Sequence, residues 1–354
     1  MPTEIRGPDS RAEPELIDAA RLGERRAFEE LVAPFRRELH VHCYRMTGSL
    51  SDADDMLQDT LLKAWRRLDS FEPRAPFRAW LYKIATNTCL NELSVRRRPT
   101  FLAPERWSGG PPVLADVAHL EPYPDRLLNE IGDPAESLVR KEDVALAFIA
   151  AIQLLPPRQR AVLILRDVLD WSAKEVADGL EASVTSVNSA LQRARATLRT
   201  RLSDDPSVAR PGDLSDDAER KLLHRFIEAW DRADFDALAR LLREDAVLAM
   251  PPRPLWFRGR GDIINFLSTV PADGRIENIR LVEVRANRQP ATAAYISDPE
   301  NDGYQFYGLM VFSMEGDSIS VITGFPGPHI GDSFGLPSWM PGDDDDRRTS
   351  PGGV

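Results

Sequence analysis

The chain has 354 residues, of which 42% are hydrophobic and 29% are charged, and its formal net charge is -11. This length is enough for two or three domains, each with its own core. No apolar run approaches the ~18 residues that a membrane span needs. Residues 1–11 are charged and lack the apolar stretch of a secretory signal, so the sequence predicts a cytoplasmic protein with no membrane partner.

Residues 14–98 are predicted to form a helical bundle, because their apolar side chains recur at helical spacing. Ser51, followed by acidic residues, is expected to cap the third helix. The expected helices span residues 15–22, 24–46, 51–71 and 76–98.

Three residues of the metal-ligating type lie close together in the second of these helices: His40, His42 and Cys43. A helix places His40 and Cys43 near one face and turns His42 away, and no further ligand follows at a zinc spacing. The chain has only one other cysteine, Cys89, which excludes a disulfide framework and a CxxC pair. The sequence therefore predicts no metal site and no cofactor.

Proline and glycine divide the middle of the chain. Residues 99–133 hold six prolines and a Gly-Gly pair, which predicts an extended, mildly acidic connector without regular structure. Helical spacing returns over residues 134–202, and a second proline-containing linker follows at 203–215. We expect a helical part between two linkers.

The strongest local signal is a helix-turn-helix in residues 172–202, with a short helix, a turn at 181–183 and a long helix from 184. No acidic residue interrupts the long helix, which is unusual in so acidic a protein. Its short polar side chains would reach base edges and its arginines would meet phosphates, although a solvated helix of an ordinary bundle is the alternative. The predicted DNA contacts are Thr185, Ser186, Asn188, Ser189, Gln192, Arg193, Arg195 and Arg199. The predicted inner stripe is Val184, Val187, Leu191, Ala194 and Leu198.

Two other helices of the bundle carry patterned charge. Residues 76–98 mix aromatic and basic side chains, which suits either stacking on unpaired bases or a plain core with a basic helix end. Residues 52–59 carry four aspartates at helical spacing, unlike a calcium loop. A solvated first turn or a protein-binding face is the expected use of those aspartates.

Residues 216–337 are predicted to form an α+β domain, and residues 338–354 a disordered tail. The expected helices span 216–232, 235–243 and 261–270, and the expected strands 246–250, 276–285, 292–297, 304–313 and 318–325. The predicted fold is multidomain: two all-α parts, a helical bundle and a helix-turn-helix, precede one α+β domain.

Three sequence blocks together resemble an extracytoplasmic-function sigma factor of the sigma-70 family. They are DADDMLQDTLLKAWRRLDSF at 52–71, FRAWLYKIATNTCLNELSVRRR at 77–98, and LPPRQRAVLILRDVLDWSAKEVADGLEASVTSVNSALQRARATLRTRL at 155–202. The resemblance covers about half the chain, and the blocks follow the family's order. The resemblance implies sigma region 2 over 14–98, sigma region 4 over 134–202, core RNA polymerase and promoter DNA as partners, and a connector that threads the polymerase's RNA exit path. It leaves an anti-sigma partner undecided.

The resemblance also implies roles for single residues. The helix that begins at Asp52 is similar to the one that docks on the polymerase clamp, and Asn87, Thr88 and Cys89 match the loop that accepts a flipped base. The polymerase-binding set is Asp52, Asp54, Asp55, Gln58, Asp59 and Lys63. The promoter-melting set is Trp80, Lys83, Asn87, Thr88, Arg96, Arg97 and Arg98.

The last domain resembles another family. LLHRFIEAWDRADFDALARLLREDAVLAMPP, followed by WFRGRGDIINFL, is similar to the opening of SnoaL-like domains of the nuclear transport factor 2 superfamily, which implies a curved sheet that encloses an apolar cone. The fusion resembles sigma factors of the actinobacterial sigma-G type. The glycine-rich DGGGK motif of another sigma class with a related extension is absent.

Relatives of this domain include isomerases that use an aspartate and a tyrosine, but spacing singles out no acid–base pair here, and we expect no enzyme. A regulatory surface or a site for a small apolar ligand is the expectation. The catalytic candidates weighed are Asp245, Asp262, Tyr295, Tyr304 and Tyr307. The pocket candidates are Trp256, Tyr295, Phe306 and Met310.

Two other functions compete with the sigma factor. One is a helix-turn-helix regulator with a ligand-sensing domain, which would have no use for the block at 52–98. The other is a cyclase- or isomerase-like enzyme with an accessory DNA-binding domain, which requires an acid–base pair in the last domain. The order of the blocks favours the sigma factor over both.

Overall fold

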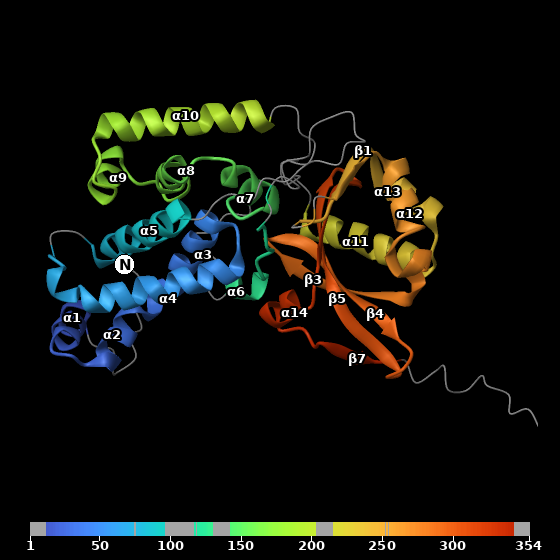
Figure 1. The fold of residues 1–354 in the computed structure, drawn as a ribbon, viewed down its shortest axis with the longest axis horizontal. Helices are drawn as coiled ribbons and strands as arrows, with labels where there is room; N and C mark the ends of the chain where they lie inside the picture. Colours follow the sequence, from blue (N-terminus) through green and yellow to red (C-terminus); the bar gives the residue numbers. More distant parts are fainter. Residues whose placement is uncertain are drawn as a thin grey trace, which may run out of the picture. The chain divides into compact units, whose positions relative to one another are not determined.

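The computed structural model in Figure 1 describes residues 12–73, 76–95, 117, 119–129, 142–202, 215–251, 253 and 255–342. The chain divides into two compact units, and each unit combines two separate stretches of sequence. The first comprises residues 1–97 and 156–195, and the second comprises residues 98–155 and 196–354. Over the described ranges, no helix has both the length and the apolarity to cross a bilayer.

Five α-helices and two 3-10 turns form the N-terminal part of the first unit. They are α1 (Glu13–Arg21), α2 (Arg25–Val32), η1 (Ala33–Phe35), α3 (Arg36–Thr47), α4 (Leu50–Arg66), η2 (Leu68–Ser70) and α5 (Phe77–Val95). The single helix predicted over 24–46 is broken in two, because Pro34 lacks the N–H that a helix interior needs. Ser49, not Ser51, caps α4, since its hydroxyl accepts from the Asp52 N–H at 3.1 Å.

A buried polar pair joins α3 to α5 inside this bundle. The His42 Nε2 lies 2.9 Å from the Thr86 hydroxyl, and the imidazole is fully buried. Burial, with the charges of Arg45 and Arg78, lowers the pKa of His42 to about 3. The ring is therefore neutral at physiological pH.

The helix-turn-helix forms as predicted and packs on the same bundle. Its helices are α8 (Pro157–Leu163), which continues as the π-helical turn η4 (Ile164–Val168), then α9 (Ala173–Gly179) and α10 (Val184–Leu202). Ser172 and Glu175 form a capping box that starts α9. The Arg160 guanidinium donates to the Met46 carbonyl, and the Trp171 ring meets the Tyr82 ring edge-on at 5.7 Å.

The second unit is built on one curved seven-stranded sheet (Figure 1), in the order β2-β1-β6-β5-β4-β3, with β7 paired to β5. The strands are β1 (Leu242–Ala249), β2 (Trp256–Arg258), β3 (Ile279–Ala286), β4 (Gln289–Asp298), β5 (Gly303–Glu315), β6 (Ser318–Pro326) and β7 (Trp339–Pro341). The helices of this part are α11 (Asp216–Asp231), α12 (Phe235–Leu241), α13 (Arg260–Leu267) and α14 (His329–Phe334). Phe226 and Trp230 of α11 pack into the core that the sheet encloses.

The predicted disordered tail is wrong at its start, because residues 339–341 are a strand. The first residues of β5, Gly303 to Gln305, lie beyond the end of β6, which pairs only as far as Gly308. An unpaired edge there would leave backbone groups without partners. The chain returns through α14, and Trp339–Pro341 occupies that edge.

The proline-rich connector also differs from the expected extended chain. Its described residues include a short helix, α6 (Asp125–Asn129), and a further helix, α7 (Leu146–Gln153), follows in the part predicted to be helical. Leu120, Tyr123 and Leu128 are buried. Both helices belong to the second unit, together with the α+β domain.

Candidate functional site

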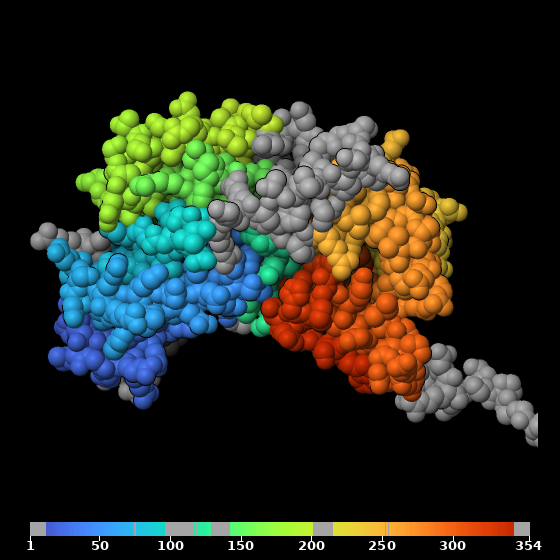
Figure 2. All heavy atoms as spheres, viewed as in Figure 1, coloured from blue at the N-terminus to red at the C-terminus, as the bar shows by residue number. Residues whose placement is uncertain are grey.

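Helix α10 lies at the surface in Figure 2, and its outer face presents most of the predicted DNA contacts to solvent. Val187, Leu191 and Ala194 are buried on the inner face as predicted. At the ends of that stripe, Val184 is exposed and Leu198 is half-buried. The exposed members of the predicted set are Thr185, Ser186, Asn188, Gln192, Arg193, Arg195 and Arg199, and Ser189 is half-buried.

Arg195 differs from the other arginines of this face. Its guanidinium makes a bidentate contact with Asp167 of η4, with N–O distances of 2.9 and 2.7 Å. The hydrogen bond and the carboxylate charge raise the pKa of Arg195. The pair joins α10 to η4, so Arg195 has a structural partner that sequence spacing did not indicate.

A polar cavity of about 390 Å³ gathers most of the predicted melting residues. Trp80, Lys83, Asn87 and Thr88 line it from α5, and Lys63 enters from α4, where its Nζ donates to the Thr88 hydroxyl at 3.2 Å. Its remaining lining residues are Arg67, Ser70, Ile84, Asn91 and Glu181. The cations and the aromatic ring are chemically suited to a phosphate and a base.

Two details of this cavity correct the sequence prediction. Asn87, Thr88 and Cys89 lie within the continuous helix α5, not in a loop, and the Cys89 side chain is buried against Cys43 in the core. Lys63, assigned to the polymerase-binding set, faces the cavity. The predicted residues Arg96, Arg97 and Arg98 lie outside the described residues.

The acidic face of α4 is exposed, as a docking surface requires. Asp52 is half-buried, and its N–H donates to the Ser49 hydroxyl at 3.1 Å. Asp54 lies 3.1 Å from the His40 Nε2, and this hydrogen bond lowers the pKa of Asp54. The exposed members are Asp54, Asp55, Gln58 and Asp59.

The suspected metal ligands have other partners. His40 contacts Asp54, His42 contacts Thr86, and the hydrogen bond with Cys89 and burial raise the pKa of Cys43. Among the residues that the structure describes, no group of three His, Cys, Asp or Glu side chains is arranged to hold a metal ion.

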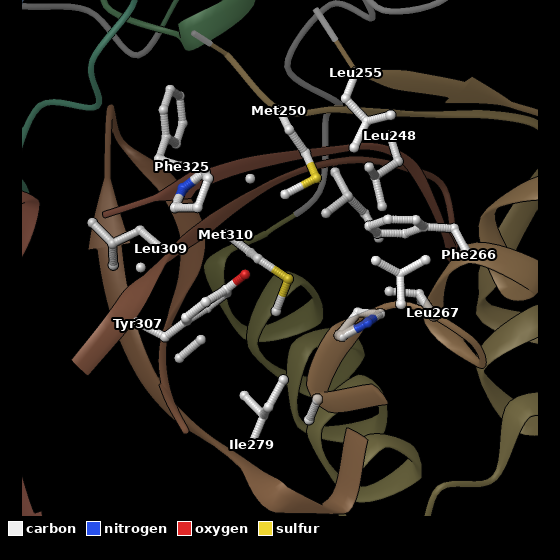
Figure 3. Close-up of a pocket in the computed structure, with 18 of the residues that line it drawn as sticks. Leu248, Met250, Leu255, Phe266, Leu267, Ile279, Tyr307, Leu309, Met310 and Phe325 are labelled. Carbon is white, nitrogen blue, oxygen red and sulfur yellow. The ribbon is translucent and has the colours of Figure 1, made fainter. Parts of the chain in front are cut away.

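An apolar cavity of about 150 Å³ lies inside the α+β domain (Figure 3). Met310 and Tyr307 of β5 face Phe266 and Leu267 of α13 across it. Of the four predicted pocket residues, the structure brings only Met310 to this cavity.

The other three predicted pocket residues lie elsewhere because strand side chains alternate between faces. Ala294 and Ile296 of β4 line the cavity, so Tyr295 between them points to the opposite face, where its ring meets Phe306 edge-on at 5.4 Å. Trp256 is buried in β2.

Of the five catalytic candidates, only Tyr307 lines this cavity. Asp245 lies in β1 and pairs with Arg243 at 2.9 Å, which lowers the pKa of Asp245. Among the described residues, no Asp, Glu or His lines the cavity; its side chains with polar atoms are Trp230, Arg253 and Tyr307. The Trp230 N–H already donates to the Ile279 carbonyl at 2.8 Å.

The turn between β3 and β4 holds the connector, a contact that the sequence analysis missed. The fully buried Asn287 accepts from the Tyr123 N–H at 2.8 Å and donates to the Val144 carbonyl at 2.7 Å. Its own N–H donates to the Tyr123 carbonyl at 2.8 Å. The Gln289 carboxamide oxygen accepts from the Leu146 N–H at 2.8 Å. One hairpin thus binds the backbone at both ends of the segment 123–146.

A buried carboxylate adds to this contact. Asp125 accepts from the Arg288 N–H at 2.7 Å and from the Arg285 Nε at 3.3 Å. Burial raises the pKa of Asp125, although both arginines oppose that shift. Asn287 and Arg288 have φ of 57° and 59°, as a two-residue hairpin turn requires. An asparagine between two strand-like runs was the only signal of this turn in the sequence.

Three known protein families match parts of the chain. Residues 31–99 match the sigma-70 region 2 family, residues 145–198 match sigma-70 region 4, and residues 223–322 match the SnoaL-like domain family. The helices around the polar cavity and the helix-turn-helix are therefore the two regions of a sigma-70-type factor. The α+β domain is SnoaL-like, which confirms the predicted fold class.

Known proteins resemble the chain over most of its length. It is 42% identical over 316 residues to the ECF RNA polymerase sigma factor SigG of Mycobacterium tuberculosis, a match that covers 88% of this chain and 84% of that protein. It is 27% identical over 188 residues to SigW of Bacillus subtilis, which covers 53% of this chain and 95% of SigW. The crystal structure of the Mycobacterium tuberculosis sigma factor SigJ has a TM-score of 0.58 at 21% identity over 88% of this chain and 99% of SigJ. The chain belongs to the extracytoplasmic-function sigma factors.

Proposed function

We propose that the chain binds core RNA polymerase and directs promoter-specific initiation with three separate surfaces. The exposed carboxylates of α4 would dock on the polymerase, the polar cavity beside α5 would hold unpaired promoter DNA, and the outer face of α10 would read the upstream element. The site in the cell would be the cytoplasm, where polymerase works.

The outer face of α10 is the observation that carries this proposal. Its polar side chains near the N-terminus are exposed at the positions from which a recognition helix contacts base edges, and its arginines follow about one to three turns beyond Asn188. In a chain with a net charge of -11, an acid-free helix face of this kind suits nucleic acid.

Reconstitution with core RNA polymerase tests the proposal. We expect the purified protein to confer promoter-specific transcript starts on core polymerase and to bind duplex promoter DNA weakly by itself. Tight operator binding in the absence of polymerase, with no stimulation of initiation in its presence, would identify a helix-turn-helix repressor instead.

We infer that the SnoaL-like domain regulates initiation through the connector and has no catalytic activity. The support for regulation is the hydrogen bonding of Asn287 and Gln289 to Tyr123, Val144 and Leu146. A connector held in this way is not free to follow an extended path. The support against catalysis is the apolar cavity, whose described lining offers no carboxylate or imidazole for proton transfer.

Binding of a small apolar molecule is a second candidate function for this domain. A cavity of about 150 Å³ is the size that admits one aromatic ring. Benzene is a suitable probe, and we expect it to raise the melting temperature of the full-length protein. The substitution Met310→Trp, which fills the space, should abolish the shift; equal shifts in both proteins would place benzene elsewhere.

A further inference from the structure

The region 2 cavity contains one side chain that does not come from region 2. Glu181 lies in the turn between α9 and α10, and its carboxylate lines the cavity beside Lys83, with the Oε1 3.4 Å from the Lys83 Nζ. The other charged side chains of the described lining are all cationic: Lys63, Arg67 and Lys83. The helix-turn-helix thus supplies the carboxylate of an otherwise basic cavity.

The backbone at Glu181 is unusual for a residue with a side chain. Its φ is 51°, in the left-handed region, where glycine is the favoured residue. Local structure alone does not require glutamate here, because the turn is already closed by the hydrogen bond from the Ala182 N–H to the Ala177 carbonyl at 2.9 Å. A glutamate in a conformation that suits glycine points to a use for its carboxylate.

We propose that Glu181 is an internal substitute for a DNA phosphate, which closes the region 2 cavity to single-stranded DNA while the helix-turn-helix is docked on region 2. The inference rests on the proposed function, since it takes the cavity to be a DNA site. A carboxylate beside Lys83 satisfies the cation in the way that a phosphate oxygen would. A DNA strand must displace that carboxylate before it can bind.

The contact is suited to a reversible closure. The Lys83 and Glu181 side chains are 38% and 80% exposed, so the ion pair itself is weak and is screened by salt. The docked position is held by other contacts, the edge-on meeting of Trp171 with Tyr82 and the hydrogen bond from Arg160 to the Met46 carbonyl. Separation of the helix-turn-helix from region 2 would remove Glu181 and uncover the cations together.

The test is the affinity of the full-length protein for a fluorescein-labelled single-stranded oligo(dT), measured by fluorescence anisotropy at low salt. We expect Glu181→Gln, which preserves the shape of the side chain, to bind about 3- to 5-fold more tightly than the wild type. The gain should shrink as salt is raised. Asp178→Asn is the matched control: Asp178 is exposed on α9, outside the lining of the cavity, and the net charge changes equally.

The remaining outcomes separate this inference from the function on which it rests. Equal gains in Glu181→Gln and Asp178→Asn would reflect net charge alone and overturn the inference. The inference is also overturned if Glu181→Gln leaves the affinity for the oligonucleotide unchanged while Lys83→Ala weakens it. The cavity would then remain a DNA site. If Lys83→Ala leaves the affinity of the Glu181→Gln protein unchanged, the strand does not bind in the cavity, and the proposed function of the cavity fails with the inference.

Discussion

Side chains on the exposed face of α10 fall into two kinds that should respond differently to substitution. The proposed role of the exposed Arg199 is a phosphate contact, so Arg199→Ala should weaken promoter binding evenly across sequences and reduce the slope of log affinity against log salt by about 1. Asn188→Ala and Gln192→Ala should instead relax the preference for particular upstream bases, by ~1–3 kcal/mol each. Binding of the holoenzyme to a set of promoter variants measures both. A uniform loss in all three variants would mean that α10 reads no bases.

The burial of His42 predicts a pH dependence of region 2 stability. The pKa of His42 is about 3 in the folded protein and about 6.5 in an unfolded chain, so between these values the unfolded state binds the extra proton. The contribution of the neutral His42 to the free energy of unfolding is therefore fully present above about pH 6.5. It falls as the pH is lowered toward 3, by up to ~1.4 kcal/mol per pH unit.

Hydrogen–deuterium exchange in peptides of α3 and α5 at pH 7 and pH 5 measures this effect. His42→Gln, which has no titrating group, is the comparison at each pH and cancels the intrinsic pH dependence of exchange. We expect protection to fall more steeply in the wild type than in the variant. Parallel losses in the two proteins would assign the acid sensitivity to other groups.

At the residue level, the sequence predicts local chemistry better than spatial partners. The exposed face of α10 follows from helical periodicity alone, as does the acid-free charge pattern. The pairing of Arg195 with Asp167 and the entry of Lys63 into the α5 cavity depend on how helices pack. Tyr295 and Phe306 were assigned to the pocket because strand periodicity fixes alternation but not which face is enclosed.

Among the elements, the β3–β4 hairpin has an effect beyond its own sheet. Asn287→Ala would leave the Tyr123 N–H and the Val144 carbonyl buried without this partner, which should cost about 2–4 kcal/mol at this contact. Limited proteolysis should then cleave the full-length protein within residues 119–129. Asn301→Ala is the matched control, because Asn301 lies exposed in the β4–β5 hairpin and bonds to Asp298. Equal cleavage of both variants would show that Asn287 does not secure the connector.

Most helices and strands could be predicted from periodicity, and the exceptions share a physical cause. The helix α6 and the strand β7 lie in stretches whose own composition is irregular. Each is stabilised by a partner far away in the chain: Asp125 of α6 by Arg285 and Arg288, and Trp339–Pro341 by β5. Local pattern cannot reveal a segment whose backbone partners come from elsewhere.

At the scale of the whole molecule, the described part of the connector belongs to the same compact unit as the SnoaL-like domain. Truncation of that domain therefore also removes the hydrogen-bond partners of the connector. A chain that ends after Leu202 lacks Asn287 and Gln289, so residues 119–129 should become sensitive to protease. We expect initiation from a cognate promoter to change several-fold in the truncated protein. An unchanged initiation rate, with cleavage at 119–129, would mean that the contact is structural and not regulatory.

The hydrogen bonds between Tyr123 and Asn287 span 164 residues of sequence, and they impose an order on synthesis. A ribosome adds about 5–20 residues per second, so the connector emerges roughly 8–30 s before the hairpin that covers it. During that interval region 2 can fold while Tyr123, Leu128 and the apolar side chains of α7 have no hairpin to cover them. Nascent chains of this protein would therefore be open to chaperones, or to early engagement by polymerase, in a window that closes when β4 has left the ribosome.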